Sequence, residues 1–257
     1  MKIFLTGFQR SGTTLLRDVM MKHPDVKHIF HEQGILRLSK SKLYSETHLL
    51  DSHLLTEKEN GRLRKHYQLK IDFSLEKDTW GEKIPYYNMH IRKNDSNFSL
   101  FDYCDRWNDY FDENSRIIHI IRHPIDVALS TQTIGYAKSI LPPLRTYIQN
   151  VPAVLKHFRL NLDNVFTIKY EDLITNPNTS LKSLYDFCGL NSSSTLVNHI
   201  LLKEDFYWFS KINQSRAFNY KNNNKLDLRH ILSMFPQLED IINELNNKHG
   251  PKYEIIC

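Results

Sequence analysis

Short runs of apolar residues recur along the chain, and turn-forming residues bound each of them. Such runs are typical of buried parallel strands, because helices cover both faces of a parallel sheet. The runs that fit are Ile3–Thr6, Val26–Phe30, Arg116–Ile121 and Val165–Lys169, and the stretch Thr79–Ile84 can form a further strand. The sequence therefore predicts a sheet whose strands lie far apart along the chain.

Helical patterns fill the segments between these runs. The segment Thr13–Lys22 places Leu15, Leu16, Val19 and Met20 on one face. The other predicted helices are Ser99–Phe111, Pro124–Gly135, Pro143–Leu162, Thr179–Cys188 with Gly189 as its stop, and Leu226–Asn247 with a kink or break at Pro236. Strands that alternate with helices favour an α/β fold with a central, mostly parallel sheet flanked by helices.

The segments between these elements indicate how many domains the chain forms. The Asn- and Lys-rich stretch Asn213–Lys225 is the segment whose composition indicates a long loop, and no repeat or obvious linker is visible. We therefore expect a single domain over residues 1–257, in which the part from about residue 205 is a loop followed by a helix.

Composition and charge narrow the class of protein. The 257 residues are 40% hydrophobic and 25% charged, which argues against disorder, and the net charge of +5 favours anionic partners without a basic run typical of nucleic-acid tails. Cys104, Cys188 and Cys257 lie far apart, so neither a zinc site nor a disulfide framework is indicated. No apolar run reaches about 18 residues, and we expect a cytoplasmic protein without a membrane span.

The first chemical feature is the stretch Gly7-Phe-Gln-Arg-Ser-Gly-Thr-Thr14, here called the glycine loop, which follows the first strand. It keeps the two glycines and the final hydroxyl of the P-loop pattern, but Thr13 stands where the lysine belongs and Arg10 lies inside the loop. Backbone N–H groups followed by a helix N-terminus form a concavity that binds an anion. A tight strand-to-helix turn with capping hydroxyls is the alternative interpretation.

A second feature is Arg122-His-Pro-Ile-Asp-Val-Ala-Leu-Ser130, here called the arginine–serine segment. Its arginine ends a strand, and its serine follows just over two helical turns later. Pro124 and Asp126 suit the first turn of the helix between them. A guanidinium fork and a hydroxyl can bind a phosphate. Arginine and proline after a strand also occur where they only form the turn into the next helix. The strand does not end in the Asp that would hold magnesium in a nucleoside triphosphatase.

The stretch Phe4–Arg17, with His23–Val26 after it, resembles the 5′-phosphosulfate-binding loop of the sulfotransferases that use 3′-phosphoadenosine 5′-phosphosulfate (PAPS). It looks most like the branch that includes tyrosylprotein sulfotransferases and many bacterial members. The arginine–serine segment resembles the family's 3′-phosphate signature, and Lys169–Pro177 resembles its Y-E-D-L segment. The resemblance runs from Lys2 to about Leu190 and implies a P-loop NTPase-like fold, PAPS as donor, 3′-phosphoadenosine 5′-phosphate (PAP) as product and no metal.

The resemblance also implies roles for single residues in binding the donor. Arg10 would stabilise the sulfuryl oxygens, and Tyr170 would lie near the 3′-phosphate or adenine unless it only packs at the strand end. The residues implied for the 5′-phosphate are Ser11, Gly12, Thr13 and Thr14, those for the 3′-phosphate are Arg122 and Ser130, and those for a late loop that closes over the nucleotide are Ser210 and Lys225.

Three residues are implied in the chemistry itself. Lys83, in Gly81–Pro85, would donate to the bridging oxygen as the phosphate leaves. Glu32 resembles the catalytic base of the tyrosylprotein branch. His31 is the rival base, because an unperturbed imidazole titrates near neutrality.

The reaction expected from these features is in-line sulfuryl transfer to a hydroxyl of a small metabolite, lipid or glycan. Two alternatives remain at this point. A P-loop nucleoside triphosphate kinase would bind ATP or GTP with magnesium, and a non-catalytic module would bind PAP or sulfated glycans without transfer. Neither the acceptor nor the oligomeric state follows from the sequence.

Overall fold

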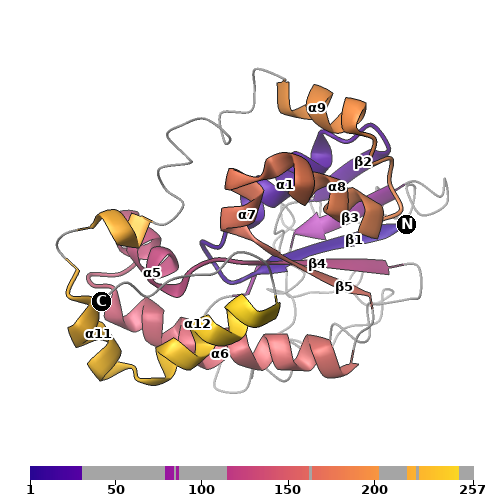
Figure 1. Cartoon of the computed structure of the whole chain (residues 1–257). Helices are drawn as coiled ribbons and strands as arrows, with labels where there is room; N and C mark the ends of the chain where they lie inside the picture. The colour runs from indigo at the N-terminus through magenta and orange to yellow at the C-terminus, as the bar shows by residue number, and fades with distance from the viewer. Residues whose placement is uncertain are drawn as a thin grey trace, which may run out of the picture.

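A computed structural model of the chain describes residues 1–30, 79–83, 85–86, 115–161, 164–202, 219–223 and 226–248. Within these residues, five strands form one sheet in the order β2-β3-β1-β4-β5, and all of its neighbouring strands are parallel (Figure 1). The strands are β1 (Lys2–Gly7), β2 (Val26–Phe30), β3 (Thr79–Lys83), β4 (Ser115–Ile121) and β5 (Val165–Lys169). Each predicted run has become a strand, and the predicted parallel sheet is confirmed.

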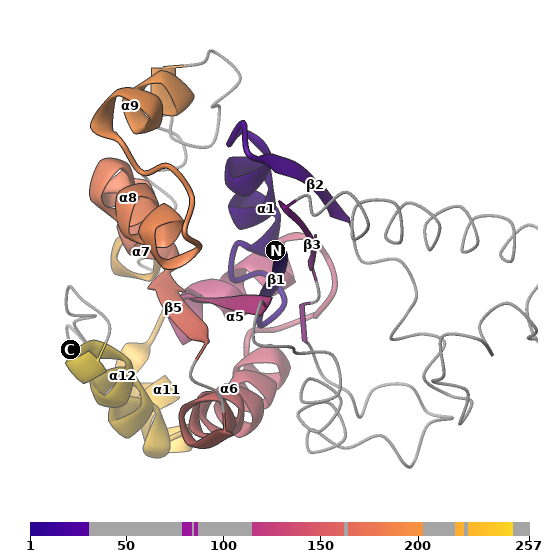
Figure 2. The same ribbon diagram turned by 90° about the vertical axis from the view of Figure 1, so that its right-hand side faces the viewer.

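Helices cover both faces of this sheet (Figures 1 and 2). One face carries α1 (Thr13–Met21), α7 (Tyr170–Thr175), α8 (Pro177–Phe187) and α9 (Ser194–Leu202), and the other carries α5 (Pro124–Thr133), α6 (Leu141–Asn161), α11 (Leu228–Met234) and α12 (Gln237–Lys248). Alternation along the central strand β1 serves both layers, because Ile3 and Leu5 pack on the α1 side while Phe4 packs on the α6 side.

The last predicted helix is broken at the proline, one of the two outcomes predicted there. It forms α11 and α12, because Phe235 leaves the helical region at φ −135° and ψ 68° just before Pro236. Within the predicted loop, Asn219–Asn222 form a 3₁₀ helix, η2. The short helices α7 and α9 were not predicted. The predicted helix Ser99–Phe111 lies outside the described residues, and the single domain over the whole chain stays a prediction.

The sheet brings the ends of four strands to one edge. In parallel strands the carboxyl ends share an edge, so the segments after β1, β3, β4 and β5 emerge side by side. Gly7 ends β1 against β4, and a Cβ there would collide with the carbonyl oxygen of Ile120. The glycine therefore permits the close strand approach from which the loop departs.

Candidate functional site

The glycine loop connects β1 to α1 in a strained turn. The Ser11 N–H donates to the Phe8 carbonyl at 3.0 Å, and Arg10 (φ 71°) and Gly12 (φ 101°) both have left-handed backbones on either side of Ser11. Among the described residues other than glycine, Arg10 alone has a positive φ. A non-glycine residue in this region costs about 1–3 kcal/mol, and such strain concentrates at ligand-binding turns.

The buried atoms of the loop fit a phosphate group. Ser11 is fully buried, and its Oγ has no hydrogen-bond partner among the residues described. Leaving a buried hydroxyl unsatisfied costs about 1–3 kcal/mol, and an anion oxygen would remove that cost. A Cβ at Gly12 would lie 2.5 Å from Cδ2 of Tyr170, so only glycine leaves room for the loop beside that ring.

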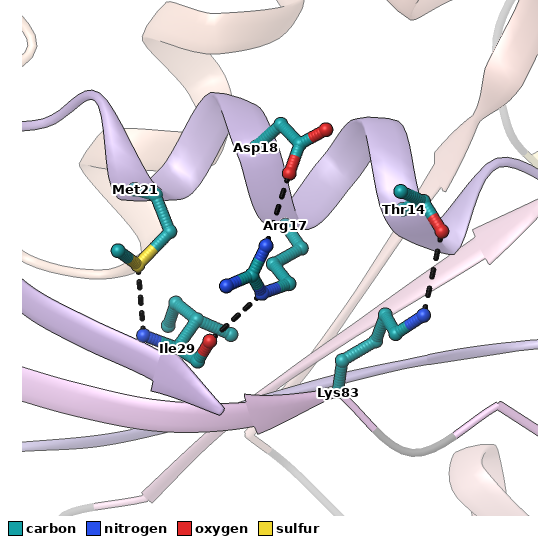
Figure 3. Close-up of polar contacts among 6 residues, drawn as sticks. All are labelled: Thr14, Arg17, Asp18, Met21, Ile29 and Lys83. Atoms are coloured by element: carbon teal, nitrogen blue, oxygen red, sulfur yellow. Dashed lines mark hydrogen bonds and ion pairs between the residues drawn. The ribbon is translucent and has the colours of Figure 1, made fainter. Parts of the chain in front are cut away.

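Lys83 brings a cation to the loop from the neighbouring strand. It ends β3 opposite Leu5 of β1, and its Nζ donates to Oγ1 of Thr14 at 3.3 Å (Figure 3). The side chain is buried, although that of Thr14 is exposed. A positive charge therefore reaches the first turn of α1, where the loop itself carries Thr13 in place of the P-loop lysine.

The arginine–serine segment contacts the glycine loop directly. Arg10 Nε donates to Ser130 Oγ at 3.2 Å, and Arg122 Nη1 donates to the Arg10 carbonyl at 3.3 Å. The Arg122 guanidinium carbon lies 4.3 Å from the centroid of the Tyr170 ring, a cation–π contact. Tyr170 packs at the end of β5, and it also touches the Arg122 guanidinium.

Buried hydrogen bonds hold the turn from β4 into α5. The Tyr147 hydroxyl donates to the Arg122 carbonyl at 2.7 Å, and the His123 N–H donates to Oε1 of Glu171 at 3.0 Å. Burial raises the pKa of Tyr147 above its ordinary value, so this hydroxyl keeps its proton. Pro124 then starts the helix without an N–H to satisfy. The backbone that carries Arg122 is thereby fixed from two other helices.

The end of β2 is tied to α1 (Figure 3). Arg17 Nε donates to the Ile29 carbonyl at 2.8 Å, and the Ile29 N–H donates to the Met21 sulfur at 2.8 Å. The sequence analysis assigned no role of its own to Arg17. The available signal was its spacing of four residues from Met21, which places both side chains on the same face of α1. These contacts fix the strand end that leads toward His31 and Glu32. Both base candidates, like Ser210 and Lys225, lie outside the described residues.

Asp126 has a partner that the sequence did not reveal. It lies in the first turn of α5, as the sequence predicted. Its side chain is only 1% exposed, and its Oδ1 accepts the Tyr220 N–H at 2.8 Å. Burial, opposed by the charge of Arg122 and assisted by Glu171, raises the pKa of Asp126 to about 6. The backbone N–H groups of Tyr220 and Asn219 act in the lowering direction.

This raised pKa predicts a pH-dependent stability difference between the wild type and Asp126→Asn. The folded carboxyl holds its proton to higher pH than the unfolded one, so its stabilising contribution is complete below about pH 4 and is lost as pH rises through about 6. Relative to the variant, the wild type should lose about 2 kcal/mol of unfolding free energy between about pH 4.5 and 7.5. Urea unfolding of both proteins at several pH values measures this, and a constant difference would contradict the assignment.

The described residues contain neither a cluster of metal-ligating side chains nor a membrane-spanning helix. In that part of the chain, no three or more His, Cys, Asp and Glu side chains gather as a metal site would require. None of the helices described is long and apolar enough to cross a membrane. Independence from metal stays a prediction.

A glycine loop on the central strand of a parallel sheet, with cations from two neighbouring strands, defines an α/β protein of the P-loop-like class. Residues 2–194 match the family described as "Sulfotransferase family". The chain therefore belongs to the sulfotransferase family. This confirms the predicted membership of the PAPS-dependent sulfotransferases and makes the protein an enzyme of that class.

Solved structures agree on the fold. The sulfotransferase domain from the Synechococcus PCC 7002 olefin synthase has a TM-score of 0.60 and 20% identity, and the match covers 100% of this chain and 96% of that one. A sulfotransferase domain from the curacin biosynthetic pathway has a TM-score of 0.64 and 18% identity, with 99% and 98% covered. No curated protein sequence matches the chain.

Proposed function

We propose that the protein binds PAPS and transfers its sulfuryl group to a hydroxyl of a small metabolite, lipid or glycan. The observation that carries the proposal is the contact between the glycine loop and the arginine–serine segment, made by Arg10 with Ser130 and by Arg122 with the Arg10 carbonyl. The two segments form adjacent but separate anion sites at the ends of β1 and β4. That arrangement suits a nucleotide with separate 5′ and 3′ anionic groups better than a linear triphosphate.

The residues divide between the two ends of the donor. The glycine loop would hold the 5′-phosphate with the hydroxyls and backbone of Ser11, Gly12, Thr13 and Thr14, and the orphaned Ser11 hydroxyl supports this role. Arg122 and Ser130 would bind the 3′-phosphate. Tyr170, already in contact with Arg122, would border the 3′-phosphate or the adenine.

The transfer step needs a base and two sources of positive charge. The acceptor oxygen bonds to sulfur as the bond between sulfur and the 5′-phosphate oxygen breaks. Glu32, with His31 as the alternative, takes the hydroxyl proton. Arg10 faces the charge on the sulfuryl oxygens, and Lys83 stabilises the departing phosphate oxygen. Glu32→Gln and His31→Gln distinguish the two bases, because loss of the base lowers kcat while PAP affinity is retained.

Two other functions make different chemical demands. A nucleoside triphosphate kinase would need an acidic magnesium ligand at this site, yet β4 leads into Arg122. A non-catalytic module would bind PAP or sulfated glycans without any need for a buried Lys83 beside the loop. The site geometry thus favours transfer.

Calorimetry of PAP, ATP and GTP, each with and without magnesium, tests the proposal on the whole chain. We expect PAP to bind most tightly and equally well in both conditions, and labelled PAPS then serves in an acceptor screen. Magnesium-dependent ATP binding without PAP binding would establish the kinase alternative. PAP binding with no transfer to any acceptor would instead favour the binding module.

A further inference from the structure

Helix η2, Asn219–Asn222, lies against the first turn of α5. The Tyr220 N–H donates to Oδ1 of Asp126 at 2.8 Å. The first N–H groups of a helix have no partner within the helix, and a carboxylate is a favourable acceptor there. Asp126 therefore supplies, from 94 residues away in the sequence, the acceptor that the start of η2 needs.

A second contact fixes the same segment. The Tyr220 ring stacks on the His123 ring with their centroids 3.8 Å apart and their planes 7° apart, and both residues are buried. Burial, reinforced by the charges of Arg122 and Lys221, lowers the pKa of His123 well below its usual range, so the imidazole is neutral at pH 7. A neutral ring can be buried against Tyr220 without an uncompensated charge.

Lys221 is held near the turn that carries Arg122, because it follows Tyr220, whose ring stacks on His123 next to Arg122. Lys221 follows Tyr220 directly and its side chain is exposed, whereas Tyr220 is buried. Asp126 itself is unsuited to touch a phosphate, because it is an acid and is 1% exposed. The Tyr220 N–H of η2, which donates to Asp126, explains why an acid is buried four residues after Arg122.

We propose that Asp126 and His123 are positioning residues, which hold η2 against α5 so that Lys221 adds its positive charge to the 3′-phosphate site at Arg122. This inference rests on the proposed function, because it assigns a further part of the PAPS site. It replaces neither Ser210 nor Lys225 as a proposed contact. Helix η2 is a described segment of the late loop, and α5 and the turn before it anchor this segment through Asp126 and His123.

The test compares PAP with adenosine 5′-monophosphate, which lacks the 3′-phosphate, by calorimetry. Asp126→Ala and Lys221→Ala should each weaken PAP binding about 5- to 30-fold and leave the monophosphate within about twofold, as loss of one charged contact predicts. The double variant should be no weaker than the weaker single variant, because both act through one contact. Asp126→Asn retains the acceptor oxygen and should bind PAP within about threefold of wild type.

Hydrogen exchange in the absence of ligand distinguishes a local loss of η2 anchoring from a general loss of stability. Hydrogen exchange at the Tyr220 amide should accelerate in Asp126→Ala and stay slow in Asp126→Asn. Asp227→Ala is the matched control, because Asp227 Oδ1 accepts the His230 N–H at the start of α11 in the same way, outside this site. It should change neither the Tyr220 amide nor the ratio of the two affinities.

The outcomes that overturn the inference differ from those that overturn the proposed function. If wild type does not prefer PAP over the monophosphate, the 3′-phosphate site is wrong and both proposals fall. If wild type has this preference but Lys221→Ala keeps it, the inference alone is wrong. Equal loss of both ligands in Asp126→Ala would assign that residue to stability only.

Discussion

Replacement of Lys83 by methionine is expected to lower kcat for sulfuryl transfer about 100- to 1000-fold, the usual effect of removing one donor from a site of developing charge. Methionine keeps most of the length and apolar volume of the side chain but removes the ammonium that contacts Thr14. Because the charge is needed most as the phosphate oxygen departs, PAP affinity should fall less than about tenfold. Release of PAP with the acceptor found by the screen measures kcat.

A matched variant controls for the loss of a lysine elsewhere. Lys182→Met lies on the exposed side of α8, and it should leave both kcat and PAP affinity unchanged. Thermal unfolding of Lys83→Met verifies that the buried substitution preserves the fold. If the folded variant kept kcat within about threefold of wild type, Lys83 would have no role in the chemical step.

Replacement of Arg122 by alanine should weaken PAP binding about 100-fold, because a guanidinium–phosphate pair contributes about 3 kcal/mol when it is bidentate and desolvated. Arg122 is buried, and its position is set by the Arg10 carbonyl and the Tyr170 ring. Adenosine 5′-monophosphate should lose much less, since it has no 3′-phosphate. Calorimetry with the two ligands gives the comparison.

Arg116→Ala is the control for this variant, because Arg116 lies near the opposite end of the same strand, where it donates to the Ser115 carbonyl. It should leave the affinity for PAP unchanged. An equal loss of PAP and monophosphate in Arg122→Ala would mean that Arg122 acts by holding the glycine loop through the Arg10 carbonyl, and not by binding the 3′-phosphate.

The differences between sequence and structure have specific causes. The helix break at Phe235 was foreseen as a kink or a break, because proline disfavours the helical conformation for the residue before it. Helix α7 was missed because it starts at Tyr170 without any intervening loop after β5, so its six residues were interpreted as a motif and not as an element. Helix η2 was missed because Asn-rich composition is typical of loops, while its start is satisfied by Asp126 from a distant element.

The sequence by itself determined the strands, the starts of α1 and α5, and the positions of the glycine loop and the arginine–serine segment at the ends of two strands. These are local properties, since an apolar run, a Gly-rich turn or a proline at a helix start acts on its own neighbours. The tertiary structure alone decided the strand order and the contacts of Arg10 with Ser130, Lys83 with Thr14 and Asp126 with Tyr220. Those contacts join segments far apart in the chain, and they depend on how the sheet packs between its two helical layers, which no local pattern specifies.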